Sequence, residues 1–169
     1  DQGLPDTATE QYRQAITLNP DYIEAQSNLL LATQYRPGIT ARELNRLHQE
    51  WDQRFAAPLR ADWQAHENAR DPEKVLQIGL VSPNLGQHPV GYFLIPLLEN
   101  MSDGTVSFIG YSDRDPDALT ERLSAAATDW RDIRGMSDDT LAATIRADHI
   151  DILFDLTGHT NKNRLLLFA

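Results

Sequence analysis

The stretch VLQIGLVSPNLGQHPVGYFLIPLLEN, residues 75–100, is the part of the sequence that indicates the fold most clearly. Residues 75–82 are almost continuously apolar, which is typical of a strand buried on both faces of a parallel sheet. Residues 89–100 predict a helix that opens on a proline. A buried strand, a short loop and a helix together indicate the start of a strand–helix–strand unit.

The same alternation continues to the end of the chain. Further strands are predicted at 106–112, 129–133 and 150–158, and the intervening helices at 117–127 and 137–148. Strands that alternate with helices of this length predict an α/β fold with a Rossmann-like parallel sheet and helices on both faces. Such sheets bind their ligands at the carboxyl ends of the strands.

The preceding region, residues 1–70, is predicted to be all α. Ala8, Tyr12, Ala15 and Pro20 have the spacing of the second helix of a tetratricopeptide repeat, in which proline ends the helix. We interpret this region as the C-terminal end of a tetratricopeptide-repeat array, with more repeats expected upstream because a single repeat cannot form a solenoid.

Two further helices follow this repeat and cap it. Thr40 and Glu43 have the spacing of an N-terminal capping pattern for the second of them. The segment 66–74 is polar and aperiodic, and predicts a linker. The expected domains are therefore 1–70, and 71–169 as the Rossmann-like first half of a catalytic region.

Composition excludes several classes of function. The 169 residues include no cysteine, which excludes disulfides and thiolate metal sites and fits a cytoplasmic protein. A net charge of −10 argues against general nucleic-acid binding. No apolar run approaches the roughly 20 residues of a membrane span, so we expect no membrane partner. The chain starts at Asp1 without a signal peptide, and we interpret it as a piece of a longer protein.

His88 lies where the loop after the first strand meets the helix. The residue before a proline is extended, so His88 is predicted at the N-cap position and Pro89 in the first turn. Free N–H groups there favour a neutral imidazole, which can accept a proton as a general base must. Gly86 and Gly91 suit close backbone approach on either side. Two interpretations stay open: a histidine that only caps the turn, and a catalytic histidine.

A second candidate loop, DLTGHT, follows the fourth predicted strand. Asp155, Gly158, His159 and Thr160 cluster there, where Gly158 permits a sharp turn and Thr160 can donate to a ligand oxygen. A capped turn into the last segment explains these residues equally well. Because both loops leave the carboxyl ends of strands, we expect His88 and His159 at the same edge of the sheet.

Other apparent motifs are set aside. Asp113, Asp115 and Asp117 alternate in SDRDPD and superficially suggest a metal site, but the proline and helix that follow favour a solvated first turn. We expect no metal. The chain has neither G-x-G-x-x-G nor a P-loop. His48 has no spaced partner and is interpreted as a surface or packing residue.

Two segments, LQIGLVSPNLGQHPVGYFLIPLLE (76–99) and IRADHIDILFDLTGHTNKNRLLLFA (145–169), resemble the start of the catalytic region of the O-linked N-acetylglucosamine transferases and their bacterial relatives. In that family tetratricopeptide repeats run directly into a two-lobed glycosyltransferase of the GT-B type. The resemblance is strong over 75–169 and looser over 7–70. It implies an incomplete first lobe preceded by a repeat end.

The resemblance implies a reaction and a set of site residues. N-acetylglucosamine would move from UDP-N-acetylglucosamine to a protein serine or threonine hydroxyl, with inversion and without a metal or other cofactor. His88 would be catalytic, and the repeats would bind the polypeptide acceptor and allow homo-oligomers. The residues expected to bind the donor or acceptor substrate are Pro89, Gly91, Asp155, Gly158, His159 and Thr160.

The family holds the uridine diphosphate mainly in the second lobe, and this chain stops at Ala169. Lys162 and Arg164 are the nearest candidates to neutralise a diphosphate. We therefore expect the chain to require the remaining catalytic lobe and to be inactive alone. Two alternatives stay open: a repeat-based interaction module with a non-catalytic α/β domain, and a flavodoxin-like small-molecule binder, which the missing phosphate loop weakens.

Overall fold

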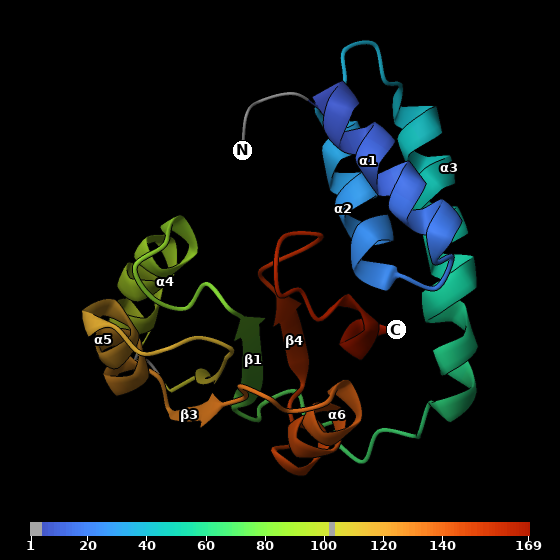
Figure 1. The fold of residues 1–169 in the computed structure, drawn as a ribbon. Coiled ribbons are helices and arrows are strands. Elements are labelled where there is room, and N and C mark those ends of the chain that lie inside the picture. The colour runs from blue at the N-terminus through green and yellow to red at the C-terminus, as the bar shows by residue number, and fades with distance from the viewer. Residues whose placement is uncertain (1–4, 102–103) are drawn as a thin grey trace. The chain divides into compact units, whose positions relative to one another are not determined.

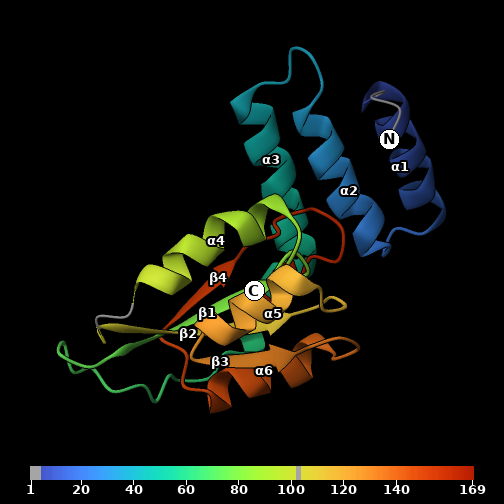
Figure 2. The same cartoon turned by 90° about the vertical axis from the view of Figure 1, so that its left-hand side faces the viewer.

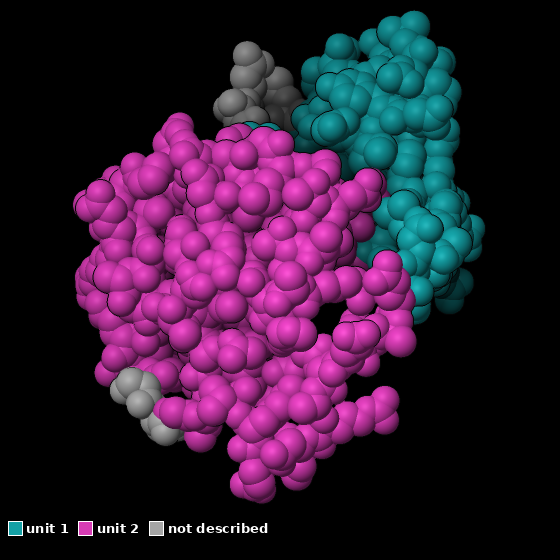
Figure 3. Space-filling model, turned by 90° about the horizontal axis from the view of Figure 1, so that it is seen from below, with its two compact units in different colours: residues 1–63, 159–161, 169 teal, residues 64–158, 162–168 magenta. Residues whose placement is uncertain are grey.

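The computed structural model describes residues 5–101 and 104–169 (Figure 1). The chain forms two compact units, coloured separately in Figure 3. Of the described residues, 5–63, 159–161 and 169 form the helical unit, and 64–101, 104–158 and 162–168 form the α/β unit. The change of unit thus falls at Trp63 and Gln64, whereas the sequence predicted it at residues 70 and 71.

The helical unit contains the helices α1 (Pro5–Leu18), α2 (Ile23–Gln34) and α3 (Ala41–Trp51). Its buried apolar residues are mostly small or lie on α2, such as Ala25 and Leu30. The predicted cap of α3 is confirmed, because the Thr40 side chain accepts from the Glu43 N–H at 3.1 Å. A π-helical turn (Asp52–Ala56) and a 3-10 turn (Ala57–Asp62) follow α3. The assignment of these helices to a tetratricopeptide repeat stays a prediction.

The α/β unit is built on four parallel strands: β1 (Leu76–Ser82), β2 (Val106–Ser112), β3 (Asp129–Asp132) and β4 (Ile152–Asp155). Their order in the sheet is β3-β2-β1-β4. The chain therefore adds β2 and β3 on one side of β1, and then returns to place β4 on the other side of β1. This arrangement confirms the predicted Rossmann-like α/β fold.

Helices cover both faces of this sheet (Figure 2). The helices α4 (Pro89–Asn100) and α5 (Ala118–Ala126) pack on one face, and α6 (Asp138–Ala147) packs on the other. Because side chains alternate along a strand, β1 and β2 contribute to both cores. The α4–α5 core includes Ile78, Leu80, Leu94, Ile95, Leu98, Phe108 and Leu123, and the α6 core includes Val81, Ile109, Tyr111, Leu141 and Ile145.

Strand β4 is shorter than the predicted 150–158, because carboxylates occupy both of its ends. Asp151 accepts from the Gln77 N–H at 3.0 Å before the strand begins. Asp155 accepts from the N–H groups of Thr157 and Gly158, both at 2.9 Å, and these bonds turn the chain out of the sheet. A 3-10 turn (Leu165–Phe168) ends the unit, and its Leu167 packs on the α6 core.

Among the described residues, no helix is both long enough and apolar enough to span a bilayer.

Candidate active site at the carboxyl edge of the sheet

His88 caps α4, as predicted. Its backbone is extended, with φ −154° and ψ 152°, and its Nδ1 accepts from the Val90 N–H at 3.2 Å. Pro89 occupies the first turn of α4 and needs no hydrogen-bond acceptor there. The side chain of His88 is half-buried beyond the tip of β1.

The bond to Val90 determines which ring nitrogen of His88 can donate a hydrogen bond. An Nδ1 that accepts a hydrogen bond carries no proton, so the neutral ring of His88 has its proton on Nε2. The imidazolium form would place an N–H against the N–H of Val90 and the positive end of α4. In this arrangement His88 is a hydrogen-bond donor through Nε2, and Nδ1 is not available to act as a base.

The predicted close approach of Gly86 and Gly91 is confirmed. A Cβ built at Gly91 would lie 2.1 Å from the carbonyl oxygen of Gly86. The N–H of His88 donates to that same carbonyl at 2.6 Å. The loop 84–88 is therefore folded tightly onto the first turn of α4, and only a residue without a side chain fits at position 91.

The loop after β4 begins beside the end of β1. Val81 pairs with Asp155 in the sheet, and the hydroxyls of Ser82 and Thr157 lie 3.0 Å apart. Gly158 has φ +56°, in the left-handed region that glycine adopts without strain. The Asp155 carboxylate binds two backbone N–H groups of its own loop, so the structure gives it a local role in shaping the turn.

His159 and Thr160 belong to the helical unit rather than to the α/β unit that carries His88. The Nδ1 of His159 lies 2.7 Å from the Ser27 hydroxyl, and its ring meets His48 and Trp51 edge to face at centroid distances of 5.2 and 5.4 Å. His48 thus has an aromatic partner that its sequence context did not reveal. That His88 and His159 serve one substrate site stays a prediction.

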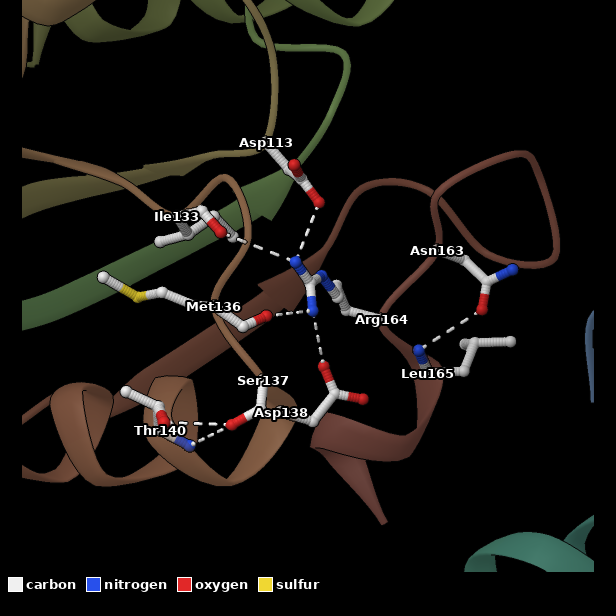
Figure 4. A network of polar contacts seen from close by, with 9 residues as sticks. All are labelled: Asp113, Ile133, Met136, Ser137, Asp138, Thr140, Asn163, Arg164 and Leu165. Atoms are coloured by element: carbon white, nitrogen blue, oxygen red, sulfur yellow. Dashed lines mark hydrogen bonds and ion pairs between the residues drawn. The ribbon is translucent and has the colours of Figure 1, made fainter.

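Arg164 is held in a polar network instead of being available to a diphosphate (Figure 4). Its guanidinium binds the carboxylates of Asp113 and Asp138 at 2.9 and 3.0 Å, and donates to the carbonyl of Met136 at 2.8 Å. Burial alone would lower the pKa of Arg164, but the bonds to the two carboxylates outweigh burial and raise it.

The prediction of a solvated turn at Asp113 was wrong, because this residue is 9% exposed and paired with Arg164. Asp115 is exposed and pairs with Arg134, as a solvated residue can. Asp117 is the N-cap of α5 and binds the N–H groups of Leu119 and Thr120. The described part of the chain contains no group of three or more histidine or acidic residues placed to hold a metal ion.

The sequence and the fold were compared with those of known proteins. No family model matches the chain. The chain is 36% identical over 159 residues to the probable UDP-N-acetylglucosamine–peptide N-acetylglucosaminyltransferase SPINDLY of Eustoma exaltatum subsp. russellianum, a match over 91% of this chain and 17% of that protein. The Arabidopsis thaliana protein named SPINDLY is 31% identical over 153 residues, which cover 88% of this chain and 17% of the relative.

A solved structure agrees with these sequences. The fold matches a mutant form of the Thermobaculum terrenum O-GlcNAc transferase with a TM-score of 0.91 and 36% identity, over 98% of this chain and 32% of that one. The chain spans about a sixth of the length of the curated relatives it matches. On this sequence identity and this shared fold, the chain belongs to the O-linked N-acetylglucosamine transferase family.

Proposed function

We propose that the chain is part of a glycosyltransferase that moves N-acetylglucosamine from UDP-N-acetylglucosamine to serine or threonine hydroxyls of a polypeptide. The proposal is supported by the relatives named SPINDLY, whose names describe them as probable UDP-N-acetylglucosamine–peptide N-acetylglucosaminyltransferases. The reaction inverts the anomeric centre and uses no metal. The acceptor oxygen forms a bond to the anomeric carbon, the bond to UDP breaks, and the hydroxyl proton leaves to a base.

The main structural support for this proposal is the geometry of His88. A parallel sheet binds ligands at its carboxyl edge, and His88 stands at that edge on the N-terminus of α4. Its ring orientation is fixed by the bond from the Val90 N–H, which leaves Nε2–H as a donor. In the proposed role this N–H binds an oxygen of the nucleotide sugar and holds the sugar in line for attack. The base is a different group.

We further propose that the chain needs the remaining catalytic lobe for turnover. A diphosphate leaving group requires cations that are not already neutralised. Most basic side chains of the α/β unit are held in ion pairs, namely Lys74, Arg114, Arg122, Arg131, Arg134 and Arg164. Lys162 lies in the 158–164 segment and stays a candidate. The cations for the diphosphate would therefore come mainly from residues outside the α/β unit of this chain.

The test is transfer of labelled N-acetylglucosamine from UDP-N-acetylglucosamine to a peptide library by a longer protein that contains this chain. Three variants separate the roles of His88. His88→Ala removes the cap and the donor, whereas His88→Asn keeps a side-chain acceptor for the Val90 N–H but loses Nε2–H. His66→Ala, an exposed histidine of the same unit, is the matched control.

Both His88 variants should lose transfer, His88→Asn should retain wild-type stability, and His66→Ala should behave as wild type. Transfer at the wild-type rate by His88→Asn would reduce His88 to a helix cap. A longer protein that transfers no sugar at all would favour the repeat-based interaction module. The 169-residue chain alone should show no turnover in the same assay.

A further inference from the structure

The loop that carries His88 is held from α5 as well as from β1. The hydroxyl of Thr120, a residue only 3% exposed, lies 3.0 Å from the carbonyl oxygen of Leu85 and donates to it. This contact joins α5 to a loop 35 residues earlier in the sequence. This bond restrains the Leu85 carbonyl, because losing a donor to a buried oxygen costs free energy. The same hydroxyl also lies 3.1 Å from an Asp117 carboxylate oxygen.

Asp117 makes the second connection, directly beside His88. One of its carboxylate oxygens caps α5 by accepting from the N–H groups of Leu119 at 3.0 Å and Thr120 at 2.8 Å. The other oxygen accepts from the N–H of Gln87 at 2.8 Å. The same carboxylate therefore ties the residue before His88 to the start of α5.

The packing around these bonds is close at both glycines of the loop and helix start, Gly86 and Gly91. A Cβ built at Gly86 would lie 2.5 Å from the Thr120 hydroxyl and 2.4 Å from the guanidinium carbon of Arg114. Arg114 in turn forms an ion pair with Asp117. On the other side, Gly91 of α4 lies against the Gly86 carbonyl. The loop is thus enclosed between the first turns of α4 and α5.

The charge on Asp117 supports this arrangement. Burial alone would raise the pKa of Asp117, but the hydrogen bonds from Gln87 and Thr120 and the charge of Arg114 outweigh burial and hold the pKa below its usual value. The carboxylate is therefore ionised at neutral pH and accepts hydrogen bonds from both α5 and the loop.

We propose that Asp117 and Thr120 are positioning residues that set the orientation of the His88 ring for sugar transfer. This inference rests on the proposed role of His88 as a hydrogen-bond donor to the nucleotide sugar. Neither side chain needs to touch the substrate. Each acts through the backbone of residues 85–87, on which the position of the His88 N–H and ring depends.

The first measurement is the nitrogen chemical shifts of the His88 ring in the 169-residue chain, which report the tautomer and its hydrogen bond. Asp117→Asn and Thr120→Val should change these shifts toward an exchanging mixture of tautomers, and Thr120→Ser should restore them. Ser137→Ala is the matched control, because Ser137 caps α6 through the Thr140 N–H at 3.2 Å and does not contact the loop. Its His88 shifts should be those of the wild type.

The second measurement is sugar transfer by the longer protein, with each variant made alone and combined with His88→Ala. Asp117→Asn and Thr120→Val should each reduce kcat roughly ten- to hundredfold, since small misplacements of a catalytic group have effects of this size. Neither should reduce further the residual transfer that His88→Ala retains in a sensitive assay, because residues that act as a unit are not additive.

The outcomes separate this inference from the proposed function. If His88→Ala abolishes transfer while Asp117→Asn and Thr120→Val transfer at the wild-type rate, the positioning role is overturned and the role of His88 stands. Loss of transfer with unchanged His88 shifts would also overturn it, because the effect would not pass through His88. Full transfer by His88→Ala would instead overturn the proposed role of His88 and, with it, the functional part of this inference.

Discussion

Arg164 and Asp113, 51 residues apart in the sequence, form an ion pair with 2.9 Å between Nη2 and Oδ2. The side chains are 17% and 12% exposed, so both charges are largely removed from water. Arg164 also binds Asp138 at the first turn of α6. Arg164 therefore joins the last segment of the chain to the end of β2, through Asp113, and to the start of α6, through Asp138.

Replacing Arg164 by methionine should lower the free energy of unfolding by about 3 kcal/mol, because it leaves the buried Asp113 carboxylate unpaired. Arg164→Lys should recover only part of this loss, since one ammonium cannot satisfy two carboxylates and the Met136 carbonyl. Urea denaturation measures both. Arg134→Ala, which removes two exposed ion pairs, with Asp115 and Asp132, is the control and should have a much smaller effect. Equal losses in Arg164→Met and Arg134→Ala would contradict the structural role.

The environment of Tyr111 leads us to expect a loss of stability at high pH. The side chain is fully buried, and its hydroxyl donates to Asp148 at 2.7 Å. Burial and this carboxylate raise the pKa of Tyr111 well above its usual value near 10. In the unfolded chain the phenol loses its proton near pH 10, whereas the native state keeps it. Stability is therefore fully present below pH 10 and falls above it, by about 1.4 kcal/mol per pH unit.

Tyr111→Phe tests this directly. At neutral pH it should cost about 1 kcal/mol, the usual value for one lost hydrogen bond, because Asp148 keeps its bond to Arg131 at 2.9 Å. Above pH 10 its stability should fall less steeply than that of the wild type. Unfolding free energies measured from roughly pH 8 to 11 provide the comparison. Parallel curves for the two proteins would show that Tyr111 does not titrate differently in the two states.

The local sequence was sufficient to predict which helices and strands form the α/β unit. The apolar runs and helical spacings predicted β1 and α4 almost to the residue, because these patterns depend only on neighbours in the chain. The position of His88 followed from the proline after it. The glycine pair at 86 and 91 also followed, since glycine near a helix start indicates close backbone approach.

Features that depend on distant residues could not be predicted in this way. Nothing near Asp113 in the sequence indicates that Arg164 will bury it. Nor does the DLTGHT motif show that His159 joins the helical unit, where it meets Ser27 and His48. In each case the local pattern was compatible with a solvated loop, and tertiary packing determined the outcome.

Residues 64–70 overlap the segment predicted as a linker, 66–74, and are tethered by Asn68, while the ion pair of Lys74 with Asp151 holds the end of that segment. The amide nitrogen of Asn68 lies within 3.1 Å of three acceptors at the start of β4, the carbonyls of His149 and Ile150 and the carboxylate of Asp151. Asn68→Ala should therefore loosen residues 64–70 while lowering global stability by only about 1 kcal/mol. Hydrogen exchange should show faster exchange confined to this segment.

Asn100→Ala is the control for this change, because the Asn100 amide donates to the Pro96 carbonyl of its own helix, α4. Exchange in residues 64–70 should be unaffected by it. If Asn68→Ala left the exchange of this segment unchanged, the three contacts would have no effect on its mobility. A large global loss of stability would instead show that the segment is an integral part of the α/β core.

Gly91 links the packing of the loop to the geometry of His88. A methyl group at this position would lie 2.1 Å from the Gly86 carbonyl, a backbone atom that can move only with the loop. Gly91→Ala should lower the free energy of unfolding by about 1 to 3 kcal/mol, as overpacking does, and should alter the nitrogen shifts of the His88 ring.

Gly135→Ala is the matched control, because Gly135 has φ +74° and no atom within 4 Å of a built Cβ. That change should also cost about 1 to 2 kcal/mol through backbone strain, but it should leave the His88 shifts unchanged. Comparable stability losses with a His88 response only in Gly91→Ala would show that loop geometry, rather than global stability, sets the ring. A His88 response in both variants, or in neither, would contradict this explanation.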